Sequence, residues 1–353
     1  MAILKKMLYY CFKVMEQISG GKRGVGGKLT AVSLFSGCGG FDWGVHRAGV
    51  EIIFANDIDP HAAAAYKGIF PKVDFILDDI CNICEFPKAD ILIGCYPCTG
   101  FSVASRRRWR NSGERDLRKR SDNFLYEQFL RALSQVQPKY LFVENVRGML
   151  SAEKGWFLRQ QTDGFDSLGY EVKYKLMSAA EFGVSQSRQR VFIVGVRKDI
   201  QNFEYSFPKP THGPKESHNY MVLQDAIGDM KEWPVGEFFD YKFHGHYLTR
   251  NRKRGWQELS YTIVADCRHV PLHPIGEPMK YIKKDTWALQ GKFNRRLSWG
   301  ESARIQGLPE NAIPSGTLDD KYRVIGNAVP PAFGTALVKP IIEFEYLDIR
   351  CTS

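Results

Sequence analysis

The hydrophobic positions of this chain form short runs, separated by longer stretches with helical spacing. Seven apolar runs of three to six residues occupy 30–35, 51–55, 75–77, 90–94, 140–143, 172–177 and 191–196. Between them, the stretches 41–48, 60–69, 123–136 and 154–168 have the spacing of helices that bury one face. Continuous apolar runs indicate strands buried on both faces. Because helices separate them, we predict an α/β fold with a doubly wound, mostly parallel sheet.

The pattern changes near residue 202. Residues 203–290 are rich in Pro, Gly, His, Tyr and Lys, and they contain only short β-like pieces such as 261–265. Patterned sequence then returns, and 331–344 is typical of a helix that begins at a proline. These changes divide the chain into four parts. They are an N-terminal extension (1–28), a main domain (29–202), a small, mainly β domain (203–290) and a return to the main domain (291–353).

Composition excludes several classes of protein. Of the 353 residues, 44% are hydrophobic and 25% are charged, which excludes a wholly disordered or fibrous chain. No apolar run approaches the roughly 18 residues of a membrane span, and the first residues do not resemble a signal peptide. Eight cysteines without a secretory signal indicate free thiols in a reducing cytoplasm.

The charge balance favours a nucleic-acid partner. Lys and Arg number 49 against 39 Asp and Glu, a net charge of +10. Residues 104–120 hold eight basic and two acidic side chains, and residues 241–256 hold five Lys or Arg, two His and no acid. Aromatic residues are interleaved with both clusters. This combination suits phosphate contacts together with base stacking.

A glycine-rich turn follows the first predicted strand. It contains Phe35, Gly37, Gly39 and Gly40 and precedes a predicted helix, as a nucleotide-binding turn does. Asp57 follows Gly37 by 20 residues, at the end of the next strand, where an acid can bind ribose hydroxyls. These features alone leave open an ordinary glycine turn, a nicotinamide dehydrogenase or an adenosyl cofactor.

Two reactive side chains follow neighbouring predicted strands. Cys98 comes after the run 90–94, and Glu144 comes after the run 140–143. Ligands of open α/β sheets bind beyond the carboxyl ends of strands, so a thiol and a carboxylate there suggest a nucleophile and an acid–base group. Taken singly, Cys98 is more typical of a small buried hydrophobe and Glu144 of a helix N-terminal carboxylate.

Zinc is the competing interpretation of the cysteines. Cys81 and Cys84, followed by Cys95 and Cys98, have the CxxC…CxxC spacing of a tetrahedral site. Cys95 and Cys98 end an apolar strand, however, and do not lie in a short knuckle. We therefore expect no metal.

Eight motifs between about residues 29 and 336 resemble, in order, those of the DNA (cytosine-5)-methyltransferases. They are 35–40, Asn56-Asp57-Ile58-Asp59, Asp79-Ile80, Pro97-Cys98, Glu144-Asn145-Val146, Gln186-Ser187-Arg188-Gln189-Arg190, 295–309 with Arg295, Glu301, Arg304 and Gln306, and Gly326-Asn327-Ala328-Val329-Pro330-Pro331. In this family the segment that lies outside the motifs, 203–290, is the variable target-recognition domain.

The resemblance implies a methyltransferase that uses S-adenosylmethionine and no metal. The reaction would methylate C5 of a cytosine flipped out of a specific double-stranded DNA sequence, through a covalent bond from Cys98 to C6. The implied catalytic residues are Cys98, Glu144, Arg190 and, in a more structural role, Arg188. The implied cofactor residues are Phe35, Gly37, Gly39, Gly40, Asp57, Ile58, Asp79, Ile80 and Asn327. The implied DNA contacts are Pro97, Thr99, Ser102, Asn145, Arg106, Arg107, Arg108 and Thr262.

One departure from the family keeps alternatives open. The residue after the nucleophile is usually Gln, and here it is Thr99. Thr99 therefore leaves open a catalytically weak DNA-binding relative. An RNA cytosine-5 methyltransferase is a second alternative, because one branch of this family modifies tRNA, although the Cys-Phe-Thr signature of that branch is absent. The expected setting is the bacterial cytoplasm. There the protein would act as a monomer on DNA, away from membranes, with a restriction endonuclease as a separately acting partner.

Overall fold

The computed structural model describes residues 28–97, 101, 117 and 120–351. Its centre is a sheet of seven strands in the order β3-β2-β1-β4-β5-β8-β6. The strands are β1 (Thr30–Leu34), β2 (Glu51–Asp57), β3 (Asp74–Leu77), β4 (Ile91–Gly94), β5 (Tyr140–Val146), β6 (Tyr170–Ser178) and β8 (Gln189–Arg197). Each corresponds to one of the seven apolar runs, so the strand predictions are confirmed.

The sheet is mostly parallel, as predicted. Neighbouring strands from β3 to β5 pair in parallel, whereas β8 runs antiparallel to both β5 and β6. The carboxyl ends of β1, β2, β4 and β5 therefore lie at one edge, together with the amino end of β8. We call this the carboxyl edge of the sheet, and it is where ligands of such sheets bind.

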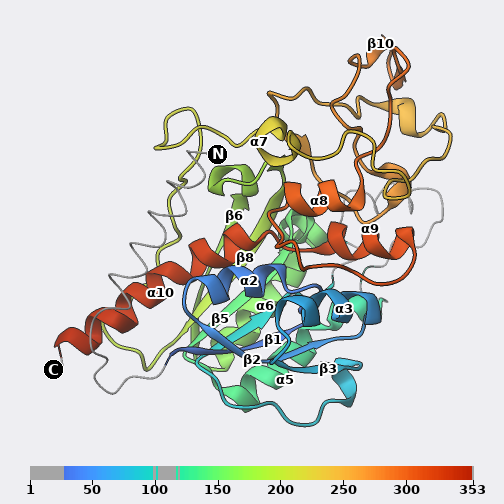
Figure 1. Ribbon diagram of the computed structural model, residues 1–353. Helices are drawn as coiled ribbons and strands as arrows, with labels where there is room; N and C mark the ends of the chain where they lie inside the picture. The colour runs from blue at the N-terminus through green and yellow to red at the C-terminus, as the bar shows by residue number, and fades with distance from the viewer. Residues whose placement is uncertain (1–27, 98–100, 102–116, 118–119, 352–353) are drawn as a thin grey trace.

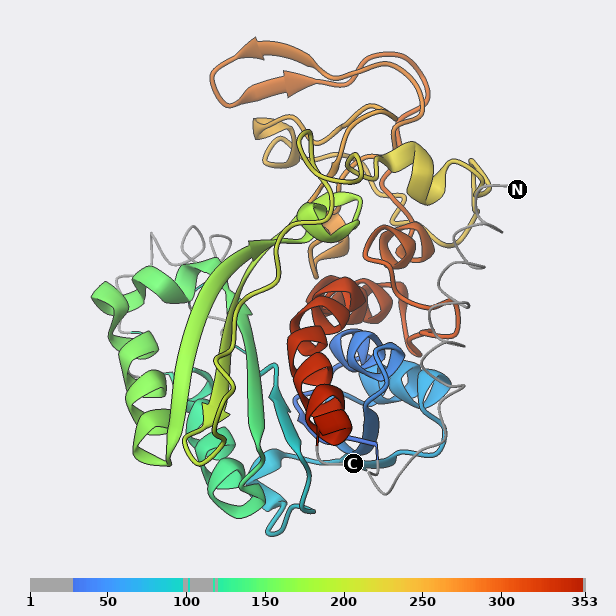
Figure 2. The same ribbon diagram turned by 90° about the vertical axis from the view of Figure 1, so that its left-hand side faces the viewer.

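Helices cover both faces of the sheet. Figure 2 shows α2 (Gly40–Arg47), α3 (Pro60–Ile69) and α10 (Pro331–Cys351) on one side and α5 (Tyr126–Val136) and α6 (Trp156–Ser167) on the other. Successive strand residues alternate between the two cores. Ile93 and Phe142 pack with α2 and α10, whereas Leu92 and Leu141 pack with α5 and α6. This alternation explains why the strands read as continuous apolar runs.

The remaining elements are short. They are η1 (Ile80–Asn82), η4 (Ser121–Phe124), η5 (Arg147–Gly155), η6 (Ala179–Phe182), β7 (Gln186–Ser187), α8 (Trp299–Ile305) and α9 (Leu318–Asn327). The predicted helix 154–168 begins later, at Trp156, because Glu153, Lys154 and Gly155 have φ values of 47°, 55° and 80°. Nowhere in the described ranges is there a helix with the length and apolarity to span a membrane.

From residue 223 onward, the 203–290 segment lies at the top of Figure 1, beyond the main sheet, whereas Tyr205 near its start is buried beside α10. Its elements are α7 (Leu223–Ile227), η7 (Tyr247–Thr249), β9 (Ser260–Tyr261), η8 (Cys267–His269), β10 (Lys280–Lys283) and β11 (Thr286–Ala288). The expected β piece 261–265 was wrong in extent, since only the two-residue β9 pairs, with β7. Beyond it, Ile263 bonds to the side chains of Gln186 and Arg188 instead of to a neighbouring strand.

Candidate active site

The glycine-rich turn lies against the last motif of the chain. After β1, Phe35 and Gly37 have φ 56° and Gly39 has φ 80°, a left-handed conformation that glycine adopts readily and phenylalanine does not. A Cβ atom on Gly40 would lie 2.3 Å from the carbonyl oxygen of Val329. This close approach requires glycine at position 40. The first and last motifs, far apart in the sequence, thus form one surface.

Asp57 faces this turn from the end of β2. One carboxylate oxygen accepts a hydrogen bond from the Gly37 amide at 2.7 Å, and the other accepts one from the Asp59 amide at 2.9 Å. Burial raises the pKa of the Asp57 carboxyl, and these backbone bonds oppose the shift. A carboxylate oxygen has more than one lone pair, so Asp57 retains acceptor capacity beside the turn.

The other predicted cofactor residues differ in exposure. Ile58 is 66% exposed beside Asp57, which is unusual for an isoleucine. Asp79 accepts a hydrogen bond from the Cys81 amide at 2.9 Å and begins η1. The Ile80 side chain is 2% exposed and packs in the core, and Asn327 is exposed at the end of α9. A surface contact by Ile80 would therefore involve its backbone.

Glu144 and Arg190 form a close pair at the carboxyl edge. They project from the neighbouring antiparallel strands β5 and β8, and Nε of Arg190 lies 2.7 Å from Oε1 of Glu144. The side chains are only 11% and 15% exposed. Burial raises the pKa of the Glu144 carboxyl, while the positive charges of Arg190 and Arg188 lower it. The pair can therefore offer a carboxyl group whose proton is held more tightly than usual, next to a guanidinium.

The residues before Cys98 leave β4 beside this pair, while Cys98 itself lies outside the described residues. Gly94 pairs with Val143, which immediately precedes Glu144. Tyr96 donates a hydrogen bond to Oε1 of buried Gln161 at 2.5 Å, and its ring meets Phe35 edge-on at 5.9 Å between ring centroids. The turn toward Cys98 is thus anchored to α6 and to the glycine-rich turn.

The neighbouring thiol is poorly suited to act as a nucleophile. Burial raises the pKa of Cys95 well above its ordinary value, and the negative charge of Glu144 adds to the shift. A protonated thiol is a weak nucleophile. Of the two cysteines that end the strand, Cys98 is therefore the better candidate.

Arg188 points away from the Glu144 pair. It is fully buried and donates hydrogen bonds to the carbonyl oxygens of Ile263, Gly326 and Ala328 at 2.8–3.2 Å. These carbonyls belong to the 203–290 segment and to the last motif. Arg188 therefore joins these two segments and does not face a substrate. We call this set of hydrogen bonds the Arg188 clamp.

Of the predicted DNA-contacting residues, Thr262 lies close to the Arg188 clamp and Asn145 follows Glu144 in β5. The Thr262 hydroxyl donates a hydrogen bond to the carbonyl oxygen of Ser187 at 2.7 Å. Asn145 is 2% exposed, and its side-chain oxygen accepts a hydrogen bond from the Val146 amide at 2.8 Å. Thr262 is accessible at the carboxyl edge, whereas Asn145 is held inside it.

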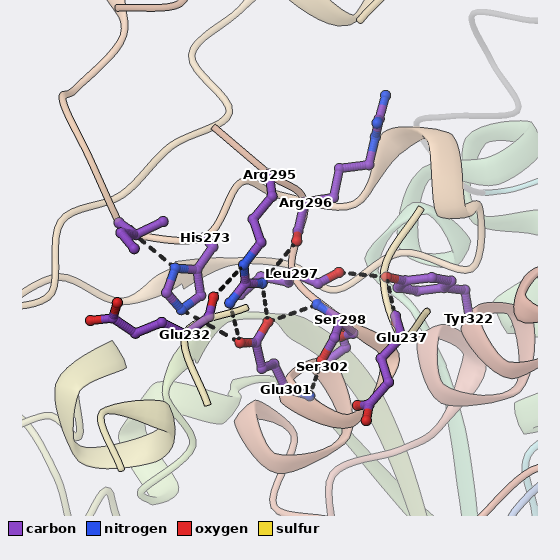
Figure 3. A network of polar contacts seen from close by, with 11 residues as sticks. Glu232, Glu237, His273, Arg295, Arg296, Leu297, Ser298, Glu301, Ser302 and Tyr322 are labelled. Atoms are coloured by element: carbon purple, nitrogen blue, oxygen red, sulfur yellow. Dashed lines mark hydrogen bonds and ion pairs between the residues drawn. The ribbon is translucent and has the colours of Figure 1, made fainter. Parts of the chain in front are cut away.

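A buried ion pair joins the 203–290 segment to the chain that follows (Figure 3). Arg295 and Glu301 are 1% and 0% exposed and form two parallel contacts of 2.7 and 2.8 Å. Nε of Arg295 donates to the Glu232 carbonyl oxygen at 2.8 Å, and Nε2 of His273 lies 3.5 Å from Glu301. Burial lowers the pKa of His273 to about 3, so at neutral pH it is an uncharged imidazole.

Several predicted DNA contacts lie outside the described residues. These are Thr99, Ser102, Arg106, Arg107 and Arg108. In the second basic cluster, 241–256, two of the charged side chains are buried and form hydrogen bonds within the protein. Arg252 and Lys253 are each 5% exposed and donate to backbone carbonyl oxygens, including those of Tyr247 and Glu277.

Sequence reasoning missed two features. The buried role of His273 had no local signal, because its partners come from Arg295 and Glu301. The exposed β10–β11 hairpin, with Lys280, Lys283 and Lys284, was overlooked because its charges lie outside the two basic clusters. Among the described residues, no group of three or more His, Cys, Asp or Glu is placed to hold a metal ion, and Cys98 of the alternative zinc set lies outside them.

Comparison with known proteins identifies the family. Residues 29–343 match the model of the C-5 cytosine-specific DNA methylases. The chain is 39% identical to the type II methyltransferase M.BsuRI of Bacillus subtilis, over 91% of this chain and 81% of that protein. It is 37% identical to M.BspRI of Lysinibacillus sphaericus, over 91% and 83% of the two chains. The fold matches the Dnmt2 methyltransferase of S. pombe with a TM-score of 0.65 and 19% identity, over 90% of this chain and 99% of that one. This chain therefore belongs to the C-5 cytosine-specific DNA methylase family.

Proposed function

We propose that this protein transfers a methyl group from S-adenosylmethionine to C5 of a cytosine flipped out of a specific DNA duplex, through a covalent bond between Cys98 and C6. The Glu144–Arg190 pair is the observation that carries the proposal, because it lies beside the end of β4, which leads to Cys98. The family match over residues 29–343 supplies the reaction class.

DNA is the substrate class. The family description names DNA methylases, and the relatives from B. subtilis and L. sphaericus are named type II methyltransferases. The RNA alternative is therefore disfavoured. We also infer that the protein works as a monomer on DNA in a bacterial cytoplasm, with a restriction endonuclease as a separately acting partner.

The residues at the carboxyl edge fit the cofactor that this family uses. Gly37, Gly39 and Gly40 form a turn in which a ligand can approach the backbone, and Asp57 retains acceptor capacity for ribose hydroxyls. Ile58 offers exposed apolar surface for packing against an adenine ring. When bound, S-adenosylmethionine supplies an electrophilic methyl group on a sulfonium.

Cys98 makes the target carbon reactive. Cytosine C5 is a weak nucleophile in the free base. Attack of the Cys98 thiolate on C6 forms an S–C6 bond and shifts an electron pair toward C5. C5 would then bond to the methyl carbon as the bond from that carbon to the sulfonium breaks, with S-adenosylhomocysteine as the leaving group. Loss of the C5 proton, followed by breakage of the S–C6 bond, releases the thiolate and the methylated base.

Glu144 and Arg190 support that attack. A carboxyl group with a raised pKa can hold a proton toward N3 of the base and stabilise the charge that the thiolate adds to the ring. Arg190 keeps Glu144 in place and offers its remaining donors to O2 of the base. Flipping the base out of the duplex costs a few kcal/mol, which contacts from residues 99–120 and from the 203–290 segment would offset.

The experiment uses DNA that contains 5-fluorocytosine, since fluorine cannot leave as the C5 proton does. The wild-type protein with S-adenosylmethionine should form an adduct that resists denaturation, and Cys98→Ala should bind DNA without forming it. Cys81→Ala, which removes an exposed thiol, serves as the matched control and should crosslink normally. An adduct that persists in Cys98→Ala, or that maps to Cys95, contradicts the mechanism. Absence of any wild-type adduct or methylation would favour the weak-enzyme alternative that Thr99 suggests.

A further inference from the structure

The β10–β11 hairpin is the outermost element of the 203–290 segment. It is a two-stranded antiparallel sheet in which Tyr281 pairs with Trp287, and Figure 2 shows it projecting away from the main sheet. A lone two-stranded hairpin is marginally stable in water. This one is held at its base, where Trp287 and Leu289 pack on a small core of Tyr247, Leu272 and Met279.

The free part of the hairpin combines positive charge with apolar surface. All four residues of β10 are exposed, with Tyr281 at 57% and Ile282 at 50%. Lys280 and Lys283 flank them, and Lys284 follows in the turn. Exposed aromatic and aliphatic side chains between ammonium groups match the sugar–phosphate backbone of a nucleic acid, which offers both anionic and apolar groups.

Four other basic residues of the same segment are already engaged within it. Arg252 and Lys253 are buried, Arg254 pairs with Glu258 at 2.7 Å, and Arg268 pairs with Asp266 at 3.1 Å. The second basic cluster therefore contributes less outward charge than its sequence suggests. The hairpin, which projects away from the main sheet, adds three exposed positive charges, those of Lys280, Lys283 and Lys284.

We propose that the β10–β11 hairpin binds the phosphate backbone of the substrate duplex through Lys280, Lys283 and Lys284, with Tyr281 packing against the sugars between them. This inference rests on the proposed function, because it names a contact with the same DNA substrate. The ammonium group is a point charge that binds any phosphate equally, so the hairpin adds affinity and leaves the choice of target sequence to other residues.

The test replaces Lys280, Lys283 and Lys284 together by Gln. The matched control replaces three exposed lysines at the edge of the sheet opposite to the carboxyl edge. They are Lys72, which precedes β3, Lys88, which precedes β4, and Lys198, which follows β8. Both variants lose three charges. Binding to cognate and non-cognate duplexes is titrated against salt, and methylation is followed by bisulfite sequencing.

The hairpin variant should bind both duplexes roughly tenfold more weakly at 0.1 M salt, with a salt slope flatter by about 0.9 for each phosphate that a lysine no longer neutralises. Its KM for DNA should rise while the methylated sequence stays the same. The control should keep the wild-type slope. If the two variants had the same DNA affinity and salt slope, the proposal would be overturned. The lysines would then serve to prevent pairing at an exposed strand edge or to bind a protein. Failure of the proposed function looks different, because the wild-type protein itself would then neither methylate nor crosslink.

Discussion

Replacing Glu301 by Gln should destabilise the protein strongly, although the change removes only a charge. Glu301 is fully buried and accepts two hydrogen bonds from Arg295 and one from the Ser298 amide at 2.7 Å. Glutamine keeps the shape but turns one acceptor into a donor that faces Arg295. The guanidinium is 1% exposed, so water cannot replace the missing carboxylate.

Breaking a buried ion pair from one side typically costs about 3–5 kcal/mol. We expect the free energy of unfolding of Glu301→Gln to fall by that amount in urea titrations. Glu310→Gln, an exposed carboxylate just beyond α8, is the control and should change it by less than about 0.5 kcal/mol. The double variant Arg295→Met with Glu301→Leu removes both charges and should lose less than the sum of the two single changes.

The same substitution should loosen the 203–290 segment before the main sheet. Arg295 holds the Glu232 carbonyl, and Glu301 lies beside His273, so both contacts across the junction depend on the pair. Hydrogen exchange should accelerate around these two residues and stay slow in β1 and β5. A Glu301→Gln protein with a free energy of unfolding within about 1 kcal/mol of wild type, and with unchanged exchange at the junction, would refute the view that this pair holds the segment in place.

Three further predictions concern the site. Asp57→Ala should weaken S-adenosylmethionine binding by about 1.5–3 kcal/mol in calorimetry, because ribose hydroxyls lose a charged acceptor, and unchanged affinity would contradict that role. Arg190→Met should raise the pKa of Glu144 further, because the positive charge that opposes the effect of burial is removed. A protein with a carboxyl group whose pKa is raised in the native state becomes less stable as pH rises through that pKa. The melting temperature of Arg190→Met should therefore fall more between pH 5 and 8 than that of wild type or of the exposed Arg147→Met control. Gly40→Ala should lower both the melting temperature and the cofactor affinity, because its methyl group would lie 2.3 Å from the Val329 carbonyl oxygen. The control is Gly49→Ala, whose methyl group has no neighbour within 4 Å. With a φ of 110°, this variant should lose stability through backbone strain alone and keep its cofactor affinity.

The strands of the main sheet and the helices beside them could be predicted from the sequence alone. The inner strands are apolar on both faces, as in Ile91–Gly94, so their runs stand out locally without knowledge of their neighbours. The places of the glycine-rich turn, Asp57 and Glu144 were also predictable, because each lies at or just beyond the end of a strand and the carboxyl ends of parallel strands meet at one edge. Cys98, which the same reasoning places there, lies outside the described residues. The order of the motifs indicated the family.

Tertiary structure decided what the polar residues of the later part of the chain do. Local sequence shows the arginines and lysine at 250–254 as one basic cluster. Folding instead buries Arg252 and Lys253 against backbone carbonyls, and it buries Arg295 between Glu301, six residues away, and the Glu232 carbonyl, 63 residues away. The same holds for Arg188, whose acceptors lie 75 to 140 residues away. Burial and pairing arise from contacts between distant segments, so neither the clamp formed by Arg188 nor the exposed hairpin could be derived from spacing along the chain.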